Sequence, residues 1–227
     1  MHTRKLLLII LILFQAVNTL RSQVTTGEWL AAGVEFNLPK KFTFGIDGQA
    51  RFFNNSYNLY KYQVQFDLGY ELHKMVDLGF SYRSEWRLEG NGSFYYRDKM
   101  FAELKLNYPV GRFKLKDRLR FQRKTRTYIR KEWQTIPLYH IRNKFELSYN
   151  IPKNKITPSL AFETFFPLNS FINTVMDEYR VTASIKYPFN KKNSIKAGIM
   201  YARELYTGNG QLVIFRLAYT FKKKVKM

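Results

Sequence analysis

The sequence contains no cysteine, and only 17 of its 227 residues are Asp or Glu. Without cysteine, a disulfide scaffold, a thiol enzyme and a cysteine-ligated zinc site are all excluded. Beyond the N-terminal segment no apolar run approaches the ~18 residues of a membrane-spanning helix, and the mean hydropathy is −0.37. A bundle of membrane helices is therefore excluded as well. Disorder is excluded because 45% of the residues are hydrophobic and can form a sizeable core.

The scarcity of acidic residues leaves a formal net charge of +21, since Lys and Arg together number 38. A strongly basic chain can indicate a partner nucleic acid. Aromatic residues are also abundant, with 20 Phe and 16 Tyr. The order of the residues along the chain decides between nucleic acid and a membrane.

The N-terminus has the form of a secretory signal peptide. Arg4 and Lys5 precede the apolar run Leu6–Phe14, which is shorter than the ~20 residues of a membrane span. We predict a signal peptide over residues 1–22, an uncleaved anchor being the alternative, and one domain over residues 23–227. Export makes a nucleic-acid partner unexpected.

Most of the remaining chain has apolar residues at every second position, which indicates half-buried β-strands. Between Tyr60 and Leu72, seven apolar residues take the even positions, and polar residues or glycine take the odd ones. The pattern is equally regular in 76–89, 112–123 and 139–151. Weaker examples are residues 29–38, 42–52, 100–108, 156–166, 178–187, 194–206 and 212–221.

The lengths of the segments and of their connections indicate a membrane barrel. The segments have about 9–14 residues, near the ~9–11 that a tilted strand needs to cross a bilayer. Short turns with proline, at 37–41, 107–112, 150–154 and 187–192, alternate with longer polar loops. Short periplasmic turns and longer extracellular loops are typical of outer-membrane barrels. We therefore predict an all-β, transmembrane, antiparallel up-and-down β-barrel of ten to twelve strands in the bacterial outer membrane.

The apolar face is expected to point outward, toward outer-membrane lipid. It is rich in Tyr, Phe and Trp near the strand ends, as in the aromatic belts of membrane barrels, and Asp117 and Asn143 are its polar interruptions. A soluble secreted β-sandwich that binds a ligand, with the same aromatic residues as its core, remains the alternative. Residues 213–221 resemble the C-terminal strand that outer-membrane barrels present to the barrel assembly machinery, although the basic tail 222–227 extends past it.

The number of strands is left open by the sequence. Eleven segments can be drawn, whereas bacterial single-chain barrels use even numbers. Either ten strands from Phe42 to Phe221 form the barrel, with residues 24–38 placed elsewhere, or a twelfth strand has been missed.

Several motifs resemble an uncharacterised family of outer-membrane β-barrels of Bacteroidota, domain of unknown function 2490. They are Gly27-Glu28-Trp29, residues 142–152, and the group formed by Pro158, Glu163 and residues 165–167. The resemblance covers essentially the whole mature chain. It implies a barrel in the outer membrane and implies no activity.

The polar face would line the lumen, and its charges are unevenly distributed. A basic lining favours anions, whereas charges that pair inside a narrow barrel hold it closed. A narrow anion-leaning channel for an anionic solute and a filled structural or binding barrel both remain open. The predicted basic wall comprises Lys105, Arg112, Lys114, Lys116, Arg118, Arg120, Arg142 and Lys144. The predicted acidic wall comprises Asp67, Glu71, Asp77, Glu85 and Glu89.

Signals for chemistry are weak. No metal cluster, phosphate loop or dinucleotide motif is present, so we predict no cofactor, no metal and no catalytic residues. A lipid-modifying enzyme would depend on His140, an inward histidine, with Ser84, Ser93 or Glu85 as conceivable partners. The basic, aromatic stretch Lys124–Trp133 would suit lipopolysaccharide or a protein partner.

Overall fold

The computed structural model describes residues 24–53, 58–126, 137–169, 176–205 and 210–225. The predicted signal peptide and most of the stretch Lys124–Trp133 lie outside these residues. In the described part of the chain, no helix is long and apolar enough to cross a membrane.

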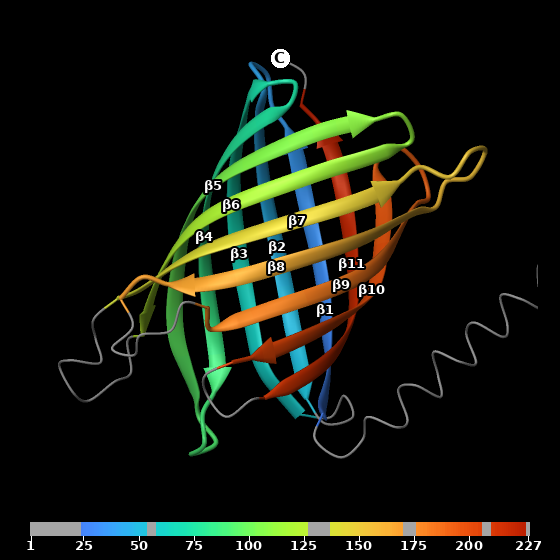
Figure 1. Ribbon diagram of the computed structural model, residues 1–227. Helices are drawn as coiled ribbons and strands as arrows, with labels where there is room; N and C mark the ends of the chain where they lie inside the picture. The colour runs from blue at the N-terminus through green and yellow to red at the C-terminus, as the bar shows by residue number, and fades with distance from the viewer. Residues whose placement is uncertain (1–23, 54–57, 127–136, 170–175, 206–209, 226–227) are drawn as a thin grey trace, which may run out of the picture.

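Eleven strands form one sheet that closes into a barrel (Figure 1). Period-two alternation produces them, because each strand then presents one apolar and one polar face. The strands are β1 Val24–Asn37, β2 Phe42–Phe53, β3 Asn58–His73, β4 Val76–Leu88, β5 Phe94–Val110, β6 Phe113–Arg126, β7 Leu138–Tyr149, β8 Thr157–Pro167, β9 Glu178–Pro188, β10 Asn193–Glu204 and β11 Gln211–Lys224.

Closure of the barrel differs from both arrangements drawn from the sequence. Consecutive strands pair antiparallel, but β1 pairs with β11 in parallel, from Val24 opposite Gln211 to Asn37 opposite Lys224. An odd number of alternating strands makes the first and last run the same way, so only a parallel pair can close the sheet. The ten-strand and twelve-strand alternatives are therefore both replaced by eleven, with residues 24–37 inside the barrel wall.

The two ends of the barrel differ in their connections. The end that we call the turn end carries the short turns after β1, β3, β5, β7 and β9, and β11 finishes there. The opposite end, the loop end, carries the connections after β2, β4, β6, β8 and β10, among them the two longest, 127–137 and 168–177, and β1 begins there. In Figure 1 β11 ends at the top, near the β1–β2 and β3–β4 turns, and β1 begins at the bottom.

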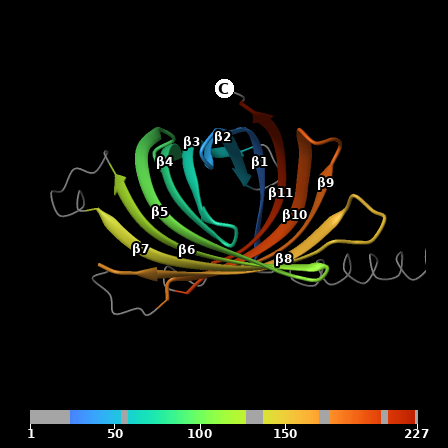
Figure 2. The same cartoon turned by 90° about the horizontal axis from the view of Figure 1, so that it is seen from above.

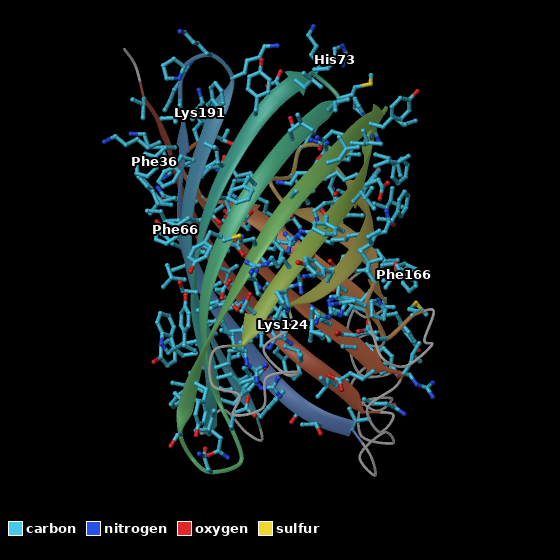
Figure 3. All side chains as sticks on the ribbon, turned by 90° about the vertical axis from the view of Figure 1, so that its left-hand side faces the viewer. Phe36, Phe66, His73, Lys124, Phe166 and Lys191 are labelled. Atoms are coloured by element: carbon cyan, nitrogen blue, oxygen red, sulfur yellow. The ribbon has the colours of Figure 1, made fainter. Side chains whose placement is uncertain are left out.

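Apolar side chains cover the outside of the barrel. Leu68, Phe80 and Leu160 are 47%, 51% and 56% exposed, and Figure 3 shows Phe66 and Phe166 pointing away from the barrel. Transfer of such a side chain out of water is favourable by ~1.5–3 kcal/mol when it is complete. Exposure to water would lose much of this free energy, whereas contact with lipid retains it. One closed sheet with an apolar exterior replaces the two-sheet sandwich alternative.

Outward aromatic rings gather near both ends of the strands. Near the turn end, Phe42 packs on Tyr70 and Phe113 on Tyr149, each pair with ring centroids 4.9 Å apart. Near the loop end, a second group joins neighbouring strands, with centroids 5.1 Å apart for Tyr62–Trp86, 5.5 Å for Trp86–Tyr96 and 6.2 Å for Tyr179–Tyr201. Two such bands match the interfacial belts of a membrane barrel.

The two polar residues of the outer face are partners. The Asn143 side-chain amide donates a hydrogen bond of 2.9 Å to the Asp117 carboxylate. The pair lies on the adjacent strands β6 and β7. Each polar group is thereby partly satisfied on a surface that is otherwise apolar.

Candidate functional site in the barrel interior

Three aromatic side chains interrupt the polar inner face. Trp29 of β1, Phe101 of β5 and Phe165 of β8 are 5%, 1% and 7% exposed. Each occupies an inward position of its strand, as Phe101 does between Lys99 and Glu103. Viewed from above, β8 lies across the barrel from β1 and β2 (Figure 2), so the inward rings of Trp29 and Phe165 belong to opposite walls.

Six arginines lie against the three rings, and together the nine residues form what we call the central layer. Guanidinium groups over aromatic faces are held by cation–π attraction, which strengthens when water is excluded. The distances from guanidinium carbon to ring centroid are 3.6 Å for Arg51–Trp29, 5.4 Å for Arg216–Trp29, 5.6 Å for Arg180–Trp29, 4.4 Å for Arg180–Phe165, 4.2 Å for Arg142–Phe165, 4.3 Å for Arg120–Phe101 and 5.0 Å for Arg83–Phe101.

The central layer extends across the lumen. Arg180 of β9 lies against both Trp29 and Phe165, although β11 and β10 separate β9 from β1 in the sheet. Arg142 continues the layer, since it lies over Phe165 and donates a hydrogen bond of 3.0 Å to Gln122. Side chains from both walls therefore narrow the lumen at the level of Trp29.

Carboxylates neutralise one part of the layer. Glu163 accepts hydrogen bonds from Arg142 at 2.8 Å and from Arg118 at 2.6 Å. Glu103 pairs with Arg120, and Glu178 pairs with Arg180 at 2.5 Å. The pairs of Glu103 and Glu163 tie β5, β6, β7 and β8 together from within, whereas the Glu178–Arg180 pair lies within β9.

The other part of the layer has no direct counter-charge. Among the described residues, no carboxylate oxygen lies within 4.0 Å of Arg51, Arg83 or Arg216. Arg51 donates instead to the Gln49 side chain at 2.8 Å, and Arg83 donates to the Gln65 side chain at 2.8 Å. Three of the six arginines of the central layer are therefore without a carboxylate partner among the described residues.

Seven of the eight predicted basic residues lie on inward positions of β5, β6 and β7. Lys116 pairs with Glu146 at 3.7 Å, and Lys144 pairs with the same carboxylate at 2.9 Å. Arg112 is the exception, because it lies exposed in the turn between β5 and β6. The seven are Lys105, Lys114, Lys116, Arg118, Arg120, Arg142 and Lys144.

The predicted acidic residues do not form a separate wall. Glu85 is 1% exposed and is held by Lys61 at 2.7 Å and Lys99 at 2.8 Å from the two neighbouring strands. Glu71 is exposed near the turn end, and Glu89 follows β4, where it pairs with Arg97. The remaining two are inward: Asp67 accepts from Ser81 at 2.5 Å, and Asp77 accepts from Asn107 at 2.8 Å.

Acidic residues are in fact interleaved with basic ones on the side where the sequence had indicated only positive charge. Glu103, Glu146 and Glu163 lie on β5, β7 and β8, each held by two or more cations. The alternation of the sequence already predicts that these three side chains point inward. Which cations they contact depends on how neighbouring strands are staggered, which the alternation does not give. The arginines Arg51, Arg180 and Arg216 were likewise in inward phase and were not singled out.

His140 is not brought together with the partners suggested for it. Its Nε2 atom lies 3.2 Å from an Asp177 carboxylate oxygen, and among the described residues Asp177 is its hydrogen-bond partner. Ser84 faces outward near the Tyr96 hydroxyl, at 3.4 Å. Glu85 is engaged by two lysines. No hydroxyl nucleophile contacts His140 within the described part of the chain, which also holds no cluster of three metal-ligating side chains.

The fold and the interior define a membrane-type β-barrel whose inner face is polar. The chain belongs to the family described as Protein of unknown function (DUF2490), whose model matches residues 26–213. The resemblance inferred from the sequence motifs is thereby confirmed, while the bacterial phylum it suggested stays a prediction. Among curated proteins, none matches this chain.

One solved porin structure shares the architecture. The "NanC porin" is similar with a TM-score of 0.52 and 11% sequence identity, over 84% of this chain and 94% of that one. OccK5 (OpdH) of Pseudomonas aeruginosa gives a TM-score of 0.36 and 14% identity, over 76% of this chain and 54% of that one. At 11% identity, the similarity to the NanC porin shows a common fold alone.

Proposed function

We propose that the protein is an outer-membrane β-barrel, exported through a cleaved signal peptide, whose lumen is a narrow constriction that prefers anions. The apolar exterior and the two aromatic bands support the membrane location. The C-terminal strand β11 would be the segment that the barrel assembly machinery engages.

The observation that carries the anion preference is the uncompensated charge of Arg51, Arg83 and Arg216 within the central layer. In a narrow, partly desolvated lumen, charge is screened far less than in water. Three guanidiniums without a carboxylate partner therefore attract anions to the level of Trp29 and repel cations.

The width of the barrel supports a constriction instead of a wide pore. Eight strands enclose an interior filled by side chains, whereas about sixteen leave an aqueous channel. Eleven strands lie between these limits, and here aromatic rings occupy part of the space.

Single-channel recording in planar bilayers tests this function. We expect small conductance steps whose reversal potential in a KCl gradient shows a preference for chloride. The double variant Arg51→Gln/Arg216→Gln should reduce that preference, while Lys155→Gln, in the exposed β7–β8 turn, should leave it unchanged. Preference for potassium in the wild-type protein would contradict the proposal.

A filled, non-conducting barrel is the second candidate, and the ion pairs that cross-link the interior favour it. Glu85 with its two lysines and Glu163 with its two arginines join three strands each. Buried pairs of this kind hold neighbouring walls together. Absence of conductance at every voltage, from a protein with intact heat-modifiable migration on gels, would select this candidate.

A further inference from the structure

A cavity of about 370 Å³ lies on the turn side of the central layer. Because β1 runs from the loop end to the turn end, its lining residue Gly33 lies beyond Trp29 toward the turns. The volume falls within the about 300–1,000 Å³ typical of small-molecule sites. Charged side chains of opposite sign line its two sides: Asp47 and Asp67 from β2 and β3, and Lys105, Arg118 and Arg120 from β5 and β6.

The two aspartates that line this turn-side cavity have no direct counter-charge, whereas Glu35, which also lines it, is paired with Lys222 at 2.6 Å. Neither Asp47 nor Asp67 has a Lys or Arg nitrogen within 4.0 Å among the described residues. The Oδ2 atom of Asp47 is buried without any hydrogen-bond partner there. Asp67 accepts from Ser81 at 2.5 Å and from Gln65 at 2.6 Å, both of which are neutral. Two carboxylates thus face the cavity with acceptor capacity to spare.

The basic side carries the opposite excess. Glu103 is its one carboxylate partner lining the cavity, and three cations share it: Lys105 at 2.9 Å, Arg118 at 3.7 Å, and Arg120. Arg118 also reaches Glu163 at 2.6 Å, yet its Nε atom is buried without a hydrogen-bond partner among the described residues. Unused donors therefore remain on this side.

Glycines leave the cavity its space. Gly33 pairs with Asp47 across β1 and β2, and Gly79 pairs with Glu103 across β4 and β5. A Cβ on Gly79 would stand 3.4 Å from a Glu103 carboxylate oxygen and 3.6 Å from the Lys105 ammonium, and one on Gly33 would meet the Asp47 Cβ at 3.0 Å. Any larger side chain at Gly79 would occupy the volume into which these charged groups project.

We propose that the turn-side cavity binds a small zwitterion of the size of an amino acid or a short peptide. The ammonium group would be held by Asp47 and Asp67, and the carboxylate by Arg118 and Arg120. A simple anion would leave the two aspartates unpaired, and a simple cation would meet the arginines, so a ligand with both charges satisfies the most groups. This inference goes beyond the proposed anion preference and does not require that the barrel conduct.

Calorimetric titration of the full-length, purified barrel in detergent tests the inference. Three probes share a similar size: glycylglycine carries both charges, N-acetylglycine carries only the negative one, and glycylglycinamide carries only the positive one. We expect glycylglycine to bind at least about tenfold more tightly than either analogue, since each lacks one charge-assisted contact. Equal affinity for N-acetylglycine and glycylglycine, or no heat with any probe, would overturn the proposal. Because the measurement needs no conduction, its failure is distinct from failure of the channel function.

Variants locate the site. Asp47→Asn/Asp67→Asn should weaken glycylglycine binding by about tenfold and leave N-acetylglycine binding unchanged or stronger. Gly79→Val should weaken the binding of glycylglycine, because the valine side chain fills part of the cavity while every charge is kept. The matched control is Asp117→Asn, which removes a carboxylate from the outer face. Unchanged affinity in both cavity variants would refute this location, and heat-modifiable migration on gels verifies that each variant is folded.

Discussion

Trp29 of β1 and Arg51 of β2 are stacked, with the guanidinium carbon 3.6 Å from the centre of the indole ring. The same ring also lies near Arg180 and Arg216, and it belongs to a buried apolar cluster with Met200, Ala202 and Ile214. One aromatic side chain is thus a shared surface for three guanidiniums and for the small apolar cluster of β10 and β11.

Replacing Trp29 should loosen the central layer. We expect Trp29→Ala to lower the free energy of unfolding by about 3–5 kcal/mol, because a large buried ring is lost and a cavity is left. Urea unfolding in lipid vesicles measures the change. The same variant should increase single-channel conductance, since the constriction loses one of its rings.

Trp86→Ala is the matched control for this variant. Trp86 stacks on Tyr62 on the outer face, so its removal leaves the lumen intact. Its conductance should therefore equal that of the wild-type protein. An increase equal to that of Trp29→Ala would show that the central layer does not form the constriction.

Neutralising Glu85 should destabilise the barrel strongly. Glu85→Gln would leave Lys61 and Lys99, both mostly buried, without their common carboxylate. Removing one partner of a buried pair costs about 3–5 kcal/mol of stability. Urea unfolding measures it, and Glu71→Gln, at an exposed position, should change stability by less than about 0.5 kcal/mol. A further Lys61→Met change in the Glu85→Gln background should restore part of the loss.

For the polar pair of the outer face, we expect removal of both partners to be less harmful to stability than removal of one. Asn143→Leu alone should destabilise, because Asp117 then faces lipid without its amide partner. The double variant, with leucine at both positions, should be more stable in vesicles than Asn143→Leu by about 1 kcal/mol or more. In the double variant this polar pair is gone and no carboxylate is left facing lipid without a partner. Lower stability of the double variant than of Asn143→Leu would contradict a lipid-facing position.

The strand number can be tested by labelling. With eleven strands, Thr25 at the start of β1 and Lys223 in β11 lie at opposite ends of the barrel. The chain has no cysteine, so Thr25→Cys and Lys223→Cys each provide a single reactive site. A membrane-impermeant maleimide should label Thr25→Cys on intact cells and Lys223→Cys only after the outer membrane is opened. Labelling of both positions from one side would indicate an even number of strands.

Much of the fold follows from local pattern. Alternation placed the strands and identified the face that meets lipid, because a strand's side chains change sides at every residue. The same phase already implied that Phe101 and Phe165 point inward, Phe101 between Lys99 and Glu103 and Phe165 next to Glu163. Their role as surfaces for arginines was missed because aromatic residues were assigned to the exterior as a class.

The rest depends on relations that alternation does not encode. Which acid meets which base is set by the stagger between strands, so Glu163 could not be matched with Arg118, two strands away in the sheet. Likewise, the residues of β1 have an ordinary strand pattern. That pattern does not indicate whether the free edge of β1 pairs with β11. That pairing follows from closure of the whole sheet.

The parallel pair of β1 and β11 also determines when the barrel can be completed. It joins residues from the two ends of the described chain, and the ion pair between Glu35 and Lys222 links positions 187 residues apart. Contacts this distant in sequence form late, because the loop they close is the longest available. Until β11 has been synthesised and delivered, β1 keeps an open hydrogen-bonding edge. That edge stays open to pairing with other chains until the sheet closes, and a chain that stops short of β11 would remain an aggregation-prone open sheet.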